Sequence, residues 1–118
     1  MCDSKLKNLK LLLREFAENR DWKQFHSPKN LSMALSVEVS EIVEHFQWLT
    51  QEQSRDLLKD KIDEVGIELA DTFIYLIRLA DELDIDLIDT AYKKIKQNEI
   101  KYPVEKVRGS AKKYTEYD

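Results

Sequence analysis

Glycine and proline are scarce in this chain, whose 118 residues include only two of each. Turns and sheets normally use these residues, and both destabilise the interior of a helix. The scarcity of glycine and proline favours long uninterrupted helices, and the sequence therefore predicts an all-α fold. At this length we expect one domain with a modest core, and association with further copies would bury more apolar surface.

Apolar side chains recur at helical spacing in four long segments. We expect main helices over about residues 4–19, 28–49, 60–83 and 87–101, packed as a four-helix bundle, with a short helix near 51–58. Ser27-Pro28 and Asp86 are typical helix starts, Thr50-x-x-Gln53 matches a capping box, and Pro103 ends the last helix. Residues 1–103 are thus interpreted as the helical domain and 104–118 as a polar tail, extended unless a partner subunit orders it.

Charge is distributed unevenly along the chain. Residues 38–84 hold 13 acids against 4 bases, whereas residues 86–113 hold 4 acids against 8 bases. The acidic centre argues against binding of a nucleic-acid polymer, which needs a dominant basic surface. No apolar run approaches the length of a membrane span, and the single cysteine excludes an intrachain disulfide. We therefore expect a cytoplasmic protein that does not associate with membranes.

Two acidic pairs stand at helical spacing on different predicted helices, Glu38-Val-Ser-Glu41 and Glu68-Leu-Ala-Asp71. Relative to Leu31, Glu38 falls at roughly −20°, in the middle of the apolar stripe of its helix, and Glu41 at roughly −80°, on its edge. A carboxylate facing a core is costly unless it is paired or binds a metal. Oxygen ligands suit Mg²⁺, which also takes substrate phosphates, so the pairs predict a metal site for phosphate chemistry.

Polar residues on the last two long helices are consistent with this interpretation. On the otherwise apolar 60–83 helix, Glu64, Glu68, Asp71 and Tyr75 form one polar strip, which suggests a shared pocket. On the 87–101 helix, Lys94, Asn98 and Lys101 share one side, where their donors suit phosphate oxygens, although such lysines are ordinarily solvated surface residues.

The aromatic and histidine side chains have ordinary interpretations as well. Trp22 and Trp48 are by default partly buried core residues, with base stacking as the alternative. His26 and His45 lack a second soft ligand at metal-binding spacing and are more often satisfied polar residues. A non-catalytic helical module that binds a protein or metal also remains open, whereas the Glu-x-x-His motif of di-iron bundles is absent.

Longer stretches of the chain carry a family resemblance. They include Asp21-Trp22, Phe25-His26, Phe46-Gln47-Trp48, Tyr102-Pro103 and Lys112-Lys113-Tyr114-Thr115-Glu116. Over about residues 9–116 the sequence resembles the MazG-like all-α nucleoside triphosphate pyrophosphohydrolases, and within them the dCTP pyrophosphatase branch. The family motif Glu-x-x-Glu followed by Glu-x-x-Asp is matched by the four acids of the two pairs.

This resemblance implies hydrolysis of a nucleoside triphosphate between its α and β phosphates, giving a monophosphate and pyrophosphate, in nucleotide-pool cleaning. It implies Mg²⁺ as the cofactor, with Mn²⁺ as a substitute, held by Glu38, Glu41, Glu68 and Asp71. Glu41 would orient or deprotonate the attacking water. The residues implied to bind the substrate are Trp22, His26, Trp48, Tyr75, Lys94 and Asn98.

The resemblance also implies a site built between subunits of a homodimer, or of a homotetramer made from two dimers. It departs at Leu13, where dCTP-preferring members carry a histidine. A lost polar contact to the base weakens discrimination between bases, so dCTP, dUTP and modified nucleotides all stay open as the preferred substrate.

Overall fold

The structure of the protein is a computed structural model that describes residues 2–110, with side chains from Ser4 onwards. Within these residues every regular element is a helix, so the predicted all-α class is confirmed. The chain separates into two compact units, Met1–Ile85 and Asp86–Asp118. This division differs from the boundary at residue 103 that we predicted between the helical domain and the polar tail. That domain boundary stays a prediction.

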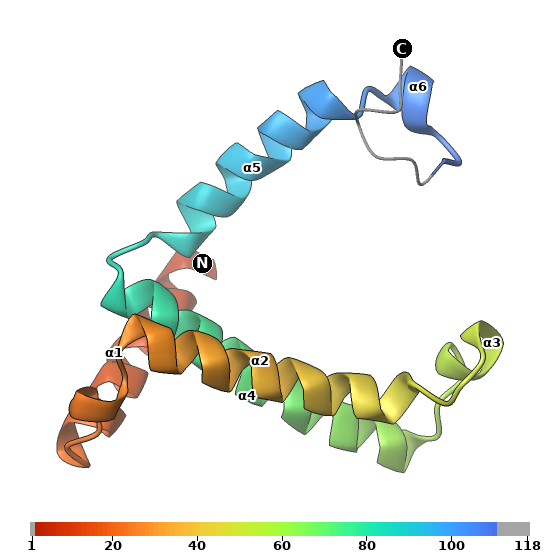
Figure 1. The fold of residues 1–118 in the computed structure, drawn as a ribbon. Helices are drawn as coiled ribbons and strands as arrows, with labels where there is room; N and C mark the ends of the chain where they lie inside the picture. Colours follow the sequence, from red (N-terminus) through yellow and green to blue (C-terminus); the bar gives the residue numbers. More distant parts are fainter. Residues whose placement is uncertain (1, 111–118) are drawn as a thin grey trace. The chain divides into compact units, whose positions relative to one another are not determined.

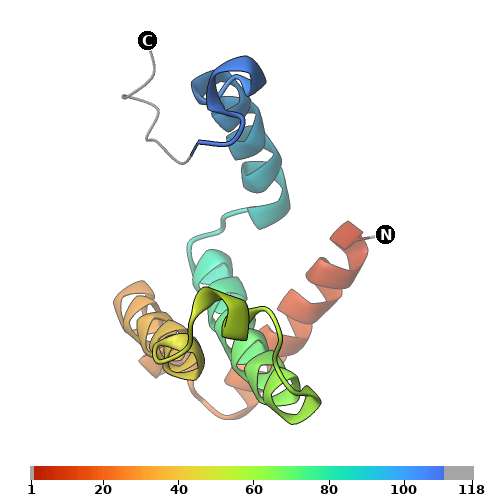
Figure 2. The ribbon, with the colours of Figure 1, turned by 90° about the vertical axis from the view of Figure 1, so that its right-hand side faces the viewer.

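The first unit is organised around an antiparallel pair of long helices. α2 and α4 lie side by side along their lengths, and the short α3 stands at the turn between them (Figure 1, Figure 2). α1 packs against α4. The helices of this unit are α1 (Cys2–Asn19), the 3₁₀ helix η1 (Lys23–Phe25), α2 (Pro28–Phe46), α3 (Gln51–Ser54) and α4 (Lys59–Glu82).

The predicted helix starts are present with their side-chain caps. Ser27 Oγ accepts a hydrogen bond from the Asn30 N–H at 3.2 Å, and Pro28 occupies the first helical turn. Thr50 and Gln53 form the capping box through reciprocal bonds of 2.9 and 3.1 Å. The second helix ends at Phe46 and not at residue 49 as predicted, because the chain must become extended at Thr50 to cap α3.

α1 ends in a paired hydrogen-bond motif that fixes the following residues. The Trp22 N–H donates to the Ala17 carbonyl at 2.9 Å and the Asp21 N–H to the Glu18 carbonyl at 3.1 Å. Asp21 lies in the left-handed region at φ 54°, which this motif requires at the position after a helix. The backbone of Trp22 is thereby tied to the last turn of α1.

The core of the first unit is small, and much apolar surface of α4 is uncovered. The buried apolar residues are Ala17, Leu31, Val65, Ile77 and Ala80. The 60–83 helix, which is apolar apart from its polar strip, is only partly covered in the single chain. The large apolar side chains of α4 that stay exposed are Ile62, Ile67, Leu69, Phe73 and Leu76.

The second unit contains α5 (Leu87–Lys101) and α6 (Val104–Val107). Asp86 caps α5 as predicted, because its side chain accepts a hydrogen bond from the Asp89 N–H at 3.0 Å. The extended tail expected over 104–118 is wrong at 104–107, which form α6, and residues 111–118 lie outside the described part. None of the described helices is both long and apolar enough to cross a membrane.

Candidate metal centre

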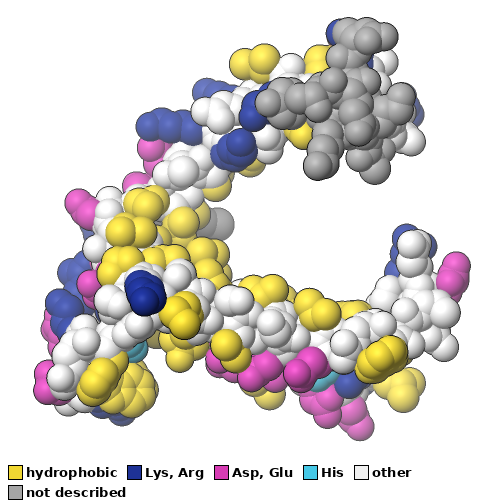
Figure 3. Space-filling view, viewed as in Figure 1, with side chains coloured by type: hydrophobic (Ala, Val, Ile, Leu, Met, Phe, Trp, Pro, Cys, Tyr) yellow, Lys and Arg dark blue, Asp and Glu magenta, His cyan; other side chains and the backbone are white. Residues whose placement is uncertain are grey.

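Three of the four predicted carboxylates converge where α2 packs against α4. Glu38 and Glu41 lie on successive turns of α2 and Glu68 on the facing part of α4. One carboxylate oxygen from each of the three lies within 4.8 Å of the others, and all three residues are half-buried. Acidic side chains gather along one edge of the α2–α4 pair, and apolar ones along the opposite edge (Figure 3).

Two oxygens of this cluster are buried without compensation. Glu38 Oε2 and Glu68 Oε2 have no hydrogen-bond partner among the described residues. An ionised carboxylate deprived of water and of donors is costly, and a bound cation would offset that cost. The ligand atoms that the three residues offer are all carboxylate oxygens, the hard ligands that Mg²⁺ and Mn²⁺ prefer. The three residues therefore fit a divalent cation of this kind.

The metal-free cluster retains a proton near neutral pH. The pKa of Glu38 is raised from 4.5 to about 7, first by burial, then by the hydrogen-bonded approach and charge of Glu41, and then by the charges of Asp71 and Glu68. The pKa of Glu68 is also raised, first by the approach of Glu41 and then by burial. Glu41 contributes to both shifts, so its carboxyl lies close to each of the other two.

Asp71 and Glu64 lie outside the group of three. Asp71 follows Glu68 by three residues and is half-buried, and its charge raises the pKa of both Glu38 and Glu68. Glu64, predicted for the same polar strip, is exposed and pairs with Lys61 at 3.6 Å on the solvent side. Its role is that of an ordinary surface acid.

The residues implied to bind substrate fall in four places. Trp22 and His26 lie together, with ring centroids 6.2 Å apart, and Phe16 contacts Trp22 edge to face at 5.7 Å. Tyr75 is half-buried on α4, whereas Trp48, just beyond α2, is 86% exposed. The other two, Lys94 and Asn98, are exposed on α5 in the second unit and share one side of it.

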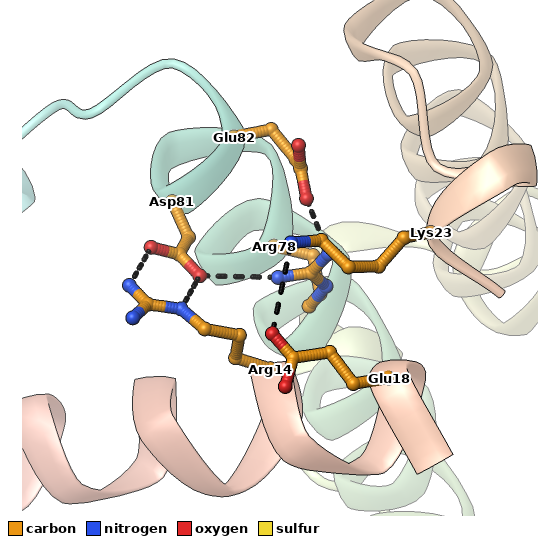
Figure 4. A network of polar contacts seen from close by, with 6 residues as sticks. All are labelled: Arg14, Glu18, Lys23, Arg78, Asp81 and Glu82. Atoms are coloured by element: carbon orange, nitrogen blue, oxygen red, sulfur yellow. Dashed lines mark hydrogen bonds and ion pairs between the residues drawn. The ribbon is translucent and has the colours of Figure 1, made fainter. Parts of the chain in front are cut away.

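Sequence reasoning missed two features near these groups. The charge of His45 lowers the pKa of Glu68, so this histidine adjoins the cluster, and its spacing of four from Glu41 was the available signal. The buried side chains of Arg78 and Asp81 form ion pairs on α4 (Figure 4). An arginine within the apolar run of a long helix was the signal for that network.

The titration of Glu38 leads to a prediction for the metal-free protein. Because its pKa is higher in the folded chain than in the unfolded one, the stability that its protonated form contributes is lost as pH rises from 4.5 to about 7. With EDTA present, the melting temperature should fall as pH rises from about 4.5 to about 7. Glu38→Gln should reduce this fall, and an equally steep fall in that variant would contradict the assignment.

Comparison with known proteins places these residues in context. A model of the MazG-like family matches residues 33–117. The dCTP pyrophosphatase 1 of Bos taurus is 41% identical over 113 residues, covering 94% of this chain and 67% of its own length. That of Homo sapiens is 39% identical over 113 residues, covering 94% of this chain and 66% of its own.

A solved structure is similar as well. The crystal structure of a pyrophosphatase from Archaeoglobus fulgidus superposes with a TM-score of 0.80 at 39% identity, over 84% of this chain and 93% of that one. The chain thus spans nearly the whole of this structure, but only about two thirds of the length of the curated relatives.

Proposed function

The chain belongs to the MazG-like family, and on that basis we propose that it is a nucleoside triphosphate pyrophosphohydrolase. It cleaves the bond between the α and β phosphates and releases a nucleoside monophosphate and pyrophosphate. One observation carries the proposal beyond likeness: Glu38, Glu41 and Glu68 converge from two helices, and two of their oxygens are buried without partners. Such a cluster is costly unless it serves to bind a cation.

Mg²⁺ is the proposed cofactor, and Mn²⁺ can replace it, because both prefer oxygen ligands. The residues that would hold the metal are Glu38, Glu41, Glu68 and Asp71. When bound, the cation would neutralise charge on the phosphate oxygens and help to orient the reacting groups. Asp71 is included because its charge already acts on Glu38 and Glu68.

Glu41 is the proposed catalytic residue. Its carboxyl lies close to those of Glu38 and Glu68. In this position it can accept a proton from a water molecule held at the cluster or orient that water for attack on the α phosphate.

The residues proposed to bind the substrate serve two parts of the nucleotide. Trp22, His26, Trp48 and Tyr75 would form the base and sugar pocket, and Lys94 and Asn98 would donate to phosphate oxygens. The curated relatives are named for dCTP, so dCTP is the first substrate to test. Cells hold these nucleotides in the cytoplasm, which is the proposed location.

A homodimer or homotetramer completes the proposal. The exposed apolar side chains of α4 are more than a single small domain can leave in water without cost. α2 adds more, and its large exposed apolar residues are Met33, Val37, Val39 and Val43. A second copy of the α2–α4 pair would cover both sets, and sedimentation would measure the resulting mass.

The reaction predicts a specific pair of products. Incubation with dCTP and Mg²⁺ should release equal amounts of dCMP and pyrophosphate, and EDTA should abolish the release. A panel of the other nucleoside triphosphates under the same conditions would identify the preferred base. Orthophosphate as the first product, or turnover in EDTA, would contradict the mechanism. No turnover with any nucleotide would favour the non-catalytic binding module.

A further inference from the structure

A chain of ion pairs joins α1 to the last turns of α4 (Figure 4). Arg14 Nε and Nη2 donate to the two oxygens of Asp81 at 3.0 and 2.6 Å. Arg78 donates to Asp81 at 3.1 Å and to Glu82 at 2.7 Å. We call these four residues the α1–α4 ion network. Its centre is buried, because the side chains of Arg78 and Asp81 are only 3% and 8% exposed.

Stability alone does not explain such a network. Removing charges from water offsets most of what a buried ion pair gains, and apolar residues of similar volume often serve as well. Asp81 and Glu82 also stand in the last turn of α4, where the helix dipole disfavours negative charge. The hydrogen bonds of this network are directional, and they therefore fix one position of α1 on α4.

That placement determines where the aromatic cluster of Phe16, Trp22 and His26 lies. Ala17, one turn beyond Arg14, is 1% exposed, and its carbonyl accepts the Trp22 N–H. The rings then contact one another in series, at 5.7 Å from Phe16 to Trp22 and 6.2 Å from Trp22 to His26. A shift of α1 along α4 would therefore move the Phe16 and Trp22 rings and change their contact with His26.

The network also acts on His26 directly. His26 Nδ1 and Arg78 Nε are both buried without a hydrogen-bond partner among the described residues. The pKa of His26 is lowered, first by burial and then by the charge of Arg78, while Glu82 opposes the shift. The ring is thus neutral at pH 7, with one nitrogen as donor and the other as acceptor.

The same face of α4 connects the network with the proposed metal centre. Arg78 follows Asp71 by seven residues, two helical turns or about 10 Å, and Tyr75 lies between them on that face. A nucleotide whose phosphates lie at the carboxylates would extend over a distance of this order.

We propose that Arg14, Arg78 and Asp81 are positioning residues, which hold the aromatic cluster in the geometry that receives the nucleobase. They act on substrate binding and not on cleavage of the phosphoanhydride. This inference rests on the proposed function, since it assumes that the cluster contacts a nucleotide.

Steady-state kinetics of pyrophosphate release test the inference. Arg14→Met, at a side chain that is 40% exposed, removes the link to α1 while Asp81 keeps its bonds to Arg78. We expect KM for the preferred nucleotide to rise by about 10-fold or more, with kcat within about 3-fold of the parent value. Arg14→Lys, which keeps the charge without the two-pronged contact, should restore part of the affinity.

Glu18→Gln is the matched control within the same region. Glu18 forms an ion pair with Lys23 at 3.6 Å, and both side chains are about half exposed. Its replacement should leave KM unchanged, because such a surface pair holds nothing in place.

A readout independent of turnover completes the test. Arg78→Met should raise the pKa of His26 in an NMR titration, assigned with a His26→Asn variant, because the opposing cation is gone. An unchanged KM in Arg14→Met, or a loss confined to kcat, would overturn the inference while leaving the proposed function intact. Failure of the parent protein to release pyrophosphate from any nucleotide would instead overturn the proposed function.

Discussion

Glu38→Gln is expected to lower the rate of pyrophosphate release by more than about 100-fold, because it removes a carboxylate from the proposed metal centre. Glutamine is nearly isosteric, so packing between α2 and α4 is preserved. It keeps an oxygen but loses the charge that attracts the cation. Steady-state assays over a range of Mg²⁺ concentrations would show whether excess metal restores part of the rate, as weakened binding requires.

Glu44→Gln is the control for this experiment. Glu44 lies on the same helix, six residues further along, and is exposed to solvent. Its replacement changes the net charge equally, and should leave the rate within about 2-fold of the parent value. Circular dichroism should show the same helix content in both variants. Full activity in Glu38→Gln would remove the basis of the metal centre.

Leu31→Ala is expected to produce the largest loss of stability. Leu31 is 1% exposed on α2, the largest fully buried side chain of the described chain. Its truncation removes buried methyl groups and leaves a cavity, at a cost of about 2–5 kcal/mol in the free energy of unfolding. A domain of this size has about 5–15 kcal/mol in total, so the loss is a large fraction.

Urea denaturation at one fixed protein concentration would measure this loss, since association would otherwise change the midpoint. Ser36→Ala on the exposed side of the same helix is the comparison, and should change the free energy of unfolding by less than about 0.5 kcal/mol. Similar losses in both variants would show that Leu31 does not have the core role assigned to it.

Helix positions and their starts could be predicted from the sequence because they depend on local interactions. The capping box at Thr50 and the cap at Asp86 involve residues three positions apart, and both are present. The end of α2 at Phe46 was missed, because apolar periodicity continues to Leu49 and only the extended cap of α3 stops the helix earlier. Helix ends are decided by such competition between neighbouring elements.

The carboxylates of the candidate site likewise show what could be predicted from the sequence and what could not. The position of Glu38 on an apolar stripe could be calculated from helical spacing, and it pointed to an acid in need of a partner. Periodicity could not show which of Glu64, Glu68 and Asp71 would face it. That depends on the register of α4 against α2, and packing brings Glu68 within reach while Glu64 faces solvent.

The sequence by itself thus determined the long helices, the faces on which their acids lie and the family to which the chain belongs. Only the tertiary structure decided that Glu38, Glu41 and Glu68 converge, that Arg14 reaches Asp81 across 67 positions of the chain, and which apolar residues of α4 stay exposed. The physical reason is the separation in sequence between the residues that interact. Helical periodicity arises from bonds between residues four apart, whereas the register between two helices arises from packing among side chains distant in sequence.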